Sequence, residues 1–111
     1  MSDPFGKDQH EPGAKLDADK VRADLVLTGF SRALWEVARV STYGANKYTE
    51  GGWEAVPDGV KRYTAACDRH RLLAAIDGPT DPESGLSHAA HHAWNALARL
   101  ELMLREAKNA S

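Results

Sequence analysis

Apolar residues recur along most of this chain at three- and four-residue steps, the spacing of one face of an α-helix. The clearest series predicts a helix that begins around Asp81–Ser84 and buries one seam along some twenty residues; its members are Leu86, Ala90, Ala93, Leu97, Leu100 and Leu104. No stretch alternates apolar and polar residues for long enough to predict a strand. The pattern therefore indicates an all-α protein.

Three further helices are predicted upstream. One runs over 17–27 with Asp17 as its N-cap and Gly29 interrupting it, and the next runs over 30–43, with Gly44 just past its end. The third starts at Asp58 and ends at Gly78. The loop 45–57 between them is long for a small helical domain, and loops of that length usually carry a function or are mobile.

These elements predict a compact helical bundle of about four helices. Residues 1–14 are rich in Gly, Pro and charge and are interpreted as a flexible arm, which leaves 15–111 as a single helical domain. The C-terminal half of the last helix is apolar nearly all round, which favours burial against a second subunit. We therefore expect a homo-oligomer that completes the bundle.

Composition excludes several classes of function. The 111 residues include 14 Lys and Arg against 16 Asp and Glu, a formal charge of −2, so we expect no nucleic-acid polymer and no membrane as partner. Cys67 is the only cysteine, which excludes a disulfide framework and a multi-cysteine zinc site. The N-terminal sequence lacks the apolar stretch of a secretory signal, and the expected compartment is the cytoplasm.

A stripe of polar residues lies opposite the leucine series on the last predicted helix: His88, His91, His92 and Asn95. Such a stripe is normally a solvated face, although solvated faces are more often built from Lys, Glu and Arg. Imidazoles one turn apart can instead share a metal ion or a phosphate. Asp81 and Glu83 just upstream either cap the helix or complete an oxygen and nitrogen cluster suited to Mn²⁺ or Mg²⁺.

Other candidates have equally open interpretations. His70 is a base or ligand, or a partly buried histidine, and Arg69 beside it is a phosphate contact or an exposed charge. Glu36 is a metal ligand or the centre of an exposed ion pair with neighbouring arginines. Three lysines are either phosphate contacts or ordinary surface charges: Lys15, Lys20 and Lys47. The aromatic residues Tyr48 and Trp53 either stack on a nucleobase or anchor the loop. Phosphate-binding loops, dinucleotide turns and nucleophile elbows are absent from the sequence.

Four stretches taken in order resemble a known family. They are Gly13–Asp17 with Lys20 and Arg22; Val40–Tyr48 followed by Trp53; Arg62-Tyr63 leading to Arg69-His70; and Asp81–His88 with His91 and Asn95. Their order and spacing resemble the phage and bacterial dATP/dGTP diphosphohydrolases, a branch of the MazG-like all-α nucleotide pyrophosphohydrolases.

The resemblance implies helical dimers or tetramers that bind divalent metal ions on acidic residues. It also implies a purine deoxynucleoside triphosphate substrate, split to the monophosphate and pyrophosphate. The wider MazG-like group holds its metals on Glu-x-x-Glu and Glu-x-x-Asp pairs, and this sequence contains neither spacing.

The resulting hypothesis gives each candidate residue a role. A divalent cofactor, Mg²⁺ or Mn²⁺, is held by Glu36, Asp81, Glu83 and His88. His91 or His70 takes a proton from the attacking water, and Arg69 acts beside them on a phosphate. The substrate is bound by Lys15, Lys20, Lys47, Tyr48, Trp53 and Asn95. Two alternatives are a nucleotide-binding protein without catalysis and a structural helical module.

Overall fold

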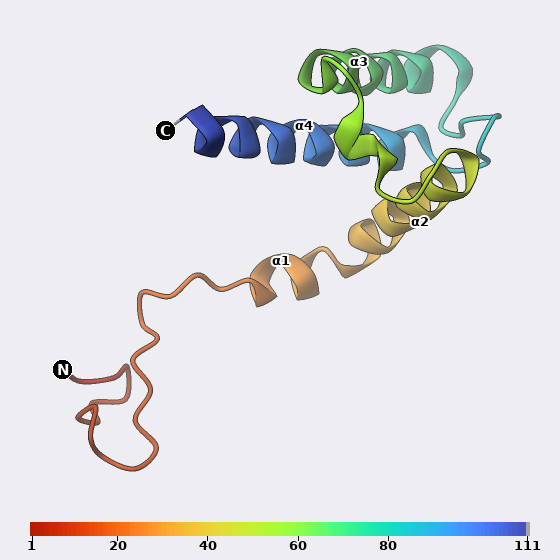
Figure 1. Cartoon of the computed structure of the whole chain (residues 1–111). Helices are drawn as coiled ribbons and strands as arrows, with labels where there is room; N and C mark the ends of the chain where they lie inside the picture. The colour runs from red at the N-terminus through yellow and green to blue at the C-terminus, as the bar shows by residue number, and fades with distance from the viewer. Residues whose placement is uncertain (111) are drawn as a thin grey trace. The chain divides into compact units, whose positions relative to one another are not determined.

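The computed structural model describes residues 1–110 and is built from helices (Figure 1). The elements are α1 (Asp24–Gly29), α2 (Ser31–Lys47), the 3-10 helix η1 (Gly52–Ala55), α3 (Gly59–Asp77) and α4 (His88–Ala110). Within residues 1–110 the only β pairings are two isolated bridges, Ser2 with Asp8 and Thr80 with Ser87. The all-α prediction is therefore confirmed. No helix of this described part is long and apolar enough to cross a membrane.

The chain divides into two compact units, and the first comprises Met1–Ser31. Its turns are organised by the buried carboxylate of Asp3, which accepts hydrogen bonds from the backbone N–H groups of Phe5, Lys7 and Lys15. The predicted helix over 17–27 is wrong at its start, because residues around Asp17 form turns and the helix begins only at Asp24. Gly29 ends this short helix rather than interrupting a longer one.

The second unit starts at Arg32 and contains nearly all of α2, with η1, α3 and α4. The prediction that helix 30–43 ends before Gly44 is wrong. Gly44 has no positive φ, and its carbonyl oxygen accepts the backbone N–H of Tyr48 at 2.9 Å, so the helix continues through Lys47. This extra turn matters because it carries Lys47 to the same face as Tyr43, four residues earlier.

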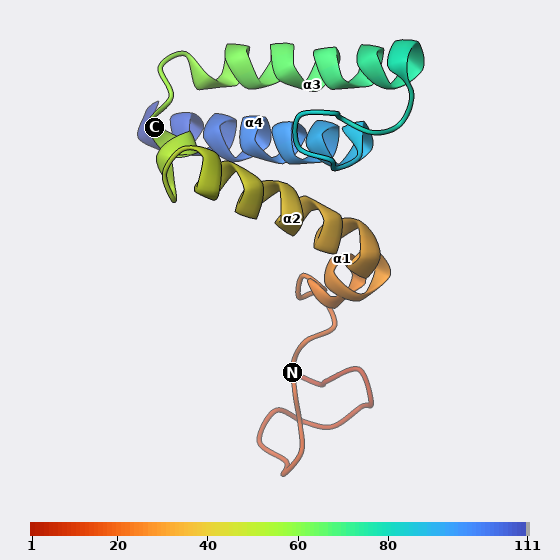
Figure 2. The same cartoon turned by 90° about the vertical axis from the view of Figure 1, so that its right-hand side faces the viewer.

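Helices α3 and α4 form an antiparallel hairpin, and they lie side by side in both views (Figures 1 and 2). The helix α3 ends at Asp77 and is capped by Gly78, whose φ of 100° is accessible to glycine without a Cβ clash. The predicted start of α4 around Asp81–Ser84 is wrong. The true N-cap is Ser87, whose Oγ accepts the backbone N–H of Ala90 at 3.0 Å, and residues 78–87 form a tight loop.

The core contains Val40, Leu86 and Ala90, with Tyr43 and Trp94 packed against them. Within the single chain, the predicted leucine seam is buried only along the first turns of α4. Leu97, Leu100 and Leu104 are 48%, 51% and 59% exposed. The reason is that α3 covers the face of α4 that carries the histidines, while the C-terminal leucines have little of this chain against them.

The segment between α2 and α3 is anchored by Trp53 in η1. The Trp53 ring makes edge contacts with the rings of Tyr63 and Trp94, at centroid distances of 6.4 and 6.0 Å. The Tyr63 hydroxyl donates a hydrogen bond of 2.7 Å to the Trp53 carbonyl oxygen. Trp53 therefore ties the long predicted loop to the hairpin.

Candidate functional site

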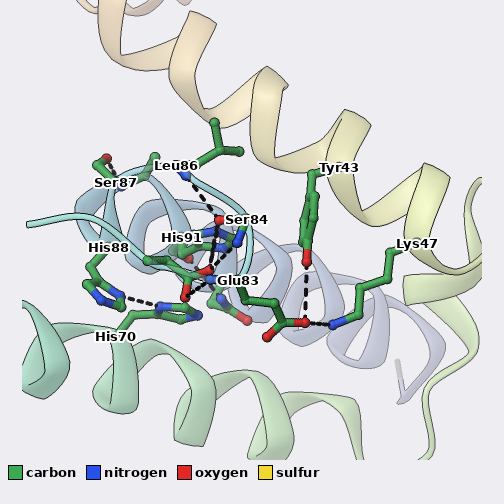
Figure 3. A network of polar contacts seen from close by, with 12 residues as sticks. Tyr43, Lys47, His70, Glu83, Ser84, Leu86, Ser87, His88 and His91 are labelled. Carbon is green, nitrogen blue, oxygen red and sulfur yellow. Dashed lines mark hydrogen bonds and ion pairs between the residues drawn. The ribbon is translucent and has the colours of Figure 1, made fainter.

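A cluster of three histidines lies where the C-terminal half of α3 meets the first turn of α4 (Figure 3). His88 is the first residue of α4 and is 1% exposed, and His91, one helical turn later, is 7% exposed. His70 approaches them from α3 and is half-buried. At His88 and His91, the polar stripe predicted on the last helix is therefore buried and is not a solvated face.

The three imidazoles are in direct mutual contact. The Nδ1 atoms of His70 and His88 are 2.9 Å apart, so one of the two carries a proton and donates it to the other. The rings of His70 and His91 are stacked, with centroids 4.5 Å apart and planes within 8°. This packing is favourable only while most of the rings are uncharged.

Burial keeps two of these rings neutral. The pKa of His70 is lowered to about 4. Desolvation by burial is the largest cause, and the neighbouring His91 and His88 also lower it. Desolvation also lowers the pKa of His91, against an opposing attraction from Asp81. Both rings are therefore neutral near pH 7, and each offers a lone pair that can accept a proton.

A carboxylate contacts the histidine cluster from the loop before α4. The Oδ2 atom of Asp81 accepts hydrogen bonds from the hydroxyl of Ser84 at 2.8 Å and from its backbone N–H at 3.2 Å. It also lies 3.4 Å from Nε2 of His91. Burial alone raises the pKa of Asp81, but the hydrogen bonds from Ser84 and from the Glu83 backbone bring it below its usual value. Asp81 is therefore ionised beside His91.

An ion pair between Lys47 and Glu83 forms the outer edge of the site. Glu83 also accepts a hydrogen bond of 3.3 Å from the hydroxyl of Tyr43, and hydrogen bonding to Lys47 holds the pKa of Glu83 below its usual value. The rings of Tyr43 and His91 are perpendicular to each other, with centroids 6.2 Å apart. These contacts attach the loop 78–87 to the last turns of α2 (Figure 3).

The structure thus brings together six of the predicted site residues: His70, His88, His91, Asp81, Glu83 and Lys47. Asn95 is also buried, one turn along α4, and its Nδ2 donates to the His91 carbonyl oxygen at 2.8 Å. Arg69 is exposed beside His70 in the chain.

The other predicted site residues have different surroundings. Glu36 makes an ion pair with Arg39, with 3.1 Å between Oε2 and Nη1. Tyr48 is 73% exposed, and Trp53 belongs to the aromatic contacts around η1. Lys15 and Lys20 fall in the unit Met1–Ser31.

Two members of the network, Tyr43 and Ser84, are not among the residues to which the sequence-based hypothesis gives a role. A signal for Tyr43 is its position four residues before Lys47, which places both on one face of a helix. A signal for Ser84 is its position three residues after Asp81, the spacing at which an aspartate can accept from a downstream serine in a turn. His92 lies apart from the cluster, with its Nδ1 2.9 Å from the carbonyl oxygen of Cys67.

Fold and site together define an all-α protein that buries neutral imidazoles beside an ionised carboxylate and a surface ion pair. The family model described as "dATP/dGTP diphosphohydrolase, N-terminal" matches residues 10–111, so this chain belongs to that family. A dATP/dGTP diphosphohydrolase of Salmonella phage PMBT28 is 36% identical over 81 residues, which are 73% of this chain and 26% of the relative. The chain thus spans about a quarter of that relative's length. No solved structure matches it.

Acidification should destabilise the protein between about pH 6.5 and pH 4. The folded His70 binds its proton only near pH 4, whereas an unfolded histidine does so near pH 6.5. Between these values the unfolded chain binds more protons, so the free energy of unfolding rises with pH; this contribution is fully present above pH 6.5 and is lost as the pH falls through 4. We expect about 1–2 kcal/mol, because the ring is partly hydrated.

Urea unfolding at pH 7.5 and pH 4.5 measures this effect. The His70→Gln variant should lose less stability over that interval than the wild type, and His92→Gln should lose as much as the wild type. Equal losses for the wild type and His70→Gln would contradict the assignment.

Proposed function

We propose that this chain binds a purine deoxynucleoside triphosphate, dGTP or dATP, and takes part in its hydrolysis to the monophosphate and pyrophosphate. The observation that carries the proposal is the buried cluster of His70, His88 and His91 with Asp81 and the Lys47–Glu83 ion pair at its edge. The family to which the chain belongs supports the same activity.

The side chains supply distinct parts of such a reaction. Neutral His91 or His70 can accept the proton of the attacking water, because their lone pairs are not protonated near pH 7. Lys47 supplies a positive charge that can bind phosphate oxygens. These oxygens would compete with the carboxylate of Glu83 for the Lys47 ammonium group. Arg69, Lys15 and Lys20 remain proposed phosphate contacts, and Tyr48, Trp53 and Asn95 remain proposed contacts of the nucleoside.

The proposal includes a divalent metal ion, Mg²⁺ or Mn²⁺. Among residues 1–110 no three His, Cys, Asp or Glu side chains are grouped to hold one ion. This donor set fits an ion that arrives with its triphosphate, since Mg²⁺ is commonly bound by one or two carboxylates and the substrate phosphates. Of the predicted ligands Glu36, Asp81, Glu83 and His88, Glu83 fits best because its carboxylate is 62% exposed. When bound, such an ion supplies charge neutralisation on the phosphates.

We also propose that the protein acts as a homo-oligomer in the cytoplasm. The exposed leucines of α4 support association, because an apolar strip on a small chain is stabilised by burial against an identical strip.

Release of pyrophosphate from dGTP and dATP, with Mg²⁺ or Mn²⁺, tests the activity. Substituting His91→Ala or Glu83→Gln should lower kcat/KM by about a hundredfold, through loss of a proton acceptor or of a carboxylate ligand for the metal ion. His92→Ala is the matched control, since His92 is on the same helix but contacts Cys67 outside the cluster, and it should keep wild-type activity.

The alternatives predict other results in the same assay. Tight binding of a nucleotide that is recovered intact would indicate a binding protein without catalysis. Absence of both turnover and any thermal shift with the eight common nucleoside triphosphates would indicate a structural module, because bound ligand raises the apparent stability.

A further inference from the structure

The hydroxyl of Ser84 occupies the centre of the polar network (Figure 3). Its Oγ lies 2.8 Å from Oδ2 of Asp81 and 2.7 Å from Nε2 of His91, and it accepts the backbone N–H of Leu86 at 3.1 Å. A serine hydroxyl has one proton to donate and two lone pairs that accept. All three capacities are therefore used, and the direction of each hydrogen bond can be assigned.

The assignment follows from the charge on Asp81. Its Oδ2 accepts the backbone N–H of Ser84, and an ionised carboxylate has no proton to donate. If the Ser84 hydroxyl donated to His91, its lone pairs would face the negatively charged Oδ2 at 2.8 Å, which is repulsive. The hydroxyl therefore donates to Asp81, and the remaining contact requires Nε2 of His91 to donate to Oγ.

We propose that Ser84 is a positioning residue that, with Asp81, holds His91 in the tautomer protonated at Nε2 and leaves Nδ1 as its accepting nitrogen. The contacts of His91 with polar side chains involve Nε2, the atom nearest both Ser84 and Asp81. No buried side-chain nitrogen or oxygen within residues 1–110 lacks a hydrogen-bond partner, so Nδ1 of His91 is not a sealed atom left without a partner.

This arrangement changes the role of Asp81 from metal ligand to orienting group. Its Oδ2 already accepts two hydrogen bonds from Ser84, and the remaining Oδ1 faces the backbone N–H of Glu83 at 3.4 Å. The consequence for catalysis rests on the proposed function. A proton removed from the attacking water adds to Nδ1 of His91, and the resulting imidazolium is stabilised by the carboxylate of Asp81, 3.4 Å from Nε2.

The tautomer can be measured without any activity. In the folded chain labelled with ¹⁵N-histidine, NMR correlations between ring nitrogens and carbon-bound ring protons at pH 7.5 should show the His91 proton on Nε2. A proton on Nδ1, or an equal mixture of tautomers, would overturn the proposal. Ser84→Ala should shift His91 toward a mixture, and Ser84→Thr, which retains a hydroxyl, should not. An unchanged tautomer in Ser84→Ala would assign the orientation to Asp81 alone and also overturn the role of Ser84.

Kinetics provide a second readout. Ser84→Ala should lower kcat at least tenfold with KM within about twofold, and Ser84→Thr should restore kcat to within about threefold of the wild type. An unchanged kcat in a folded Ser84→Ala protein would contradict the positioning role. A wild-type protein that has the Nε2 tautomer but turns over no nucleotide would overturn the proposed function and leave the assignment of Ser84 standing.

Discussion

Replacing Trp94 with alanine should lower the free energy of unfolding by about 3 kcal/mol, the largest loss of stability that we expect from a single substitution. Trp94 packs against the core of Val40, Leu86 and Ala90. Its ring also makes edge contacts with Trp53 and Tyr63, at centroid distances of 6.0 and 5.6 Å, so it joins η1, α2, α3 and α4.

The matched variant is Trp94→Phe, which keeps an aromatic ring but removes the indole N–H. That group donates a hydrogen bond of 2.6 Å to Oγ of Ser41 in α2. Its loss should cost about 1 kcal/mol, the typical contribution of one hydrogen bond. Urea unfolding followed by circular dichroism measures both values. Equal stability of the wild type and Trp94→Ala would show that the aromatic contacts do not hold the unit together.

Replacing Leu100 with lysine should weaken association of the chain at least a hundredfold, if the proposed oligomer uses the exposed face of α4. Leu97, Leu100 and Leu104 lie on one face of the helix at three- and four-residue steps and are about half exposed. A lysine in the middle of that face would place a charge in an apolar interface, where it would meet its own copy across a twofold axis.

Sedimentation velocity over a range of concentrations measures the effect. Glu106→Gln is the control, because it changes the charge by the same amount on the opposite side of α4 and should leave association unchanged. A wild-type protein that sediments as a monomer at every concentration would remove the basis of the prediction. Unaltered association in Leu100→Lys would place the interface elsewhere.

The histidines show what the sequence can and cannot determine about the site. Helical spacing correctly places His88, His91 and Asn95 on one face of one helix. Spacing does not say which face is covered, because that depends on how α3 docks. Here α3 brings His70 against His88 and His91, a contact between separate helices that no local pattern contains.

Helix ends were the other source of error. Gly44 and Asp81 are residue types that often mark helix boundaries, yet Gly44 lies inside α2 and Asp81 closes a turn before α4. A glycine can end a helix or lie within one, and an aspartate can cap a helix or close a turn. Tertiary contacts decide which of these structures forms. In this chain the relevant tertiary contacts are those of Lys47 with Glu83 and of His91 with Ser84, both in the loop 78–87.

The sequence separations within the site imply an order of assembly. His70 and His88 are 18 positions apart and are joined by a tight loop, whereas the contacts of Tyr43 and Ser41 with Glu83 and Trp94 span 40 and 53 positions. Closing the shorter loop costs less entropy, so the α3–α4 hairpin can form during early folding and α2 can dock onto it later. The imidazole contacts would then exist before the surface ion pair that borders them.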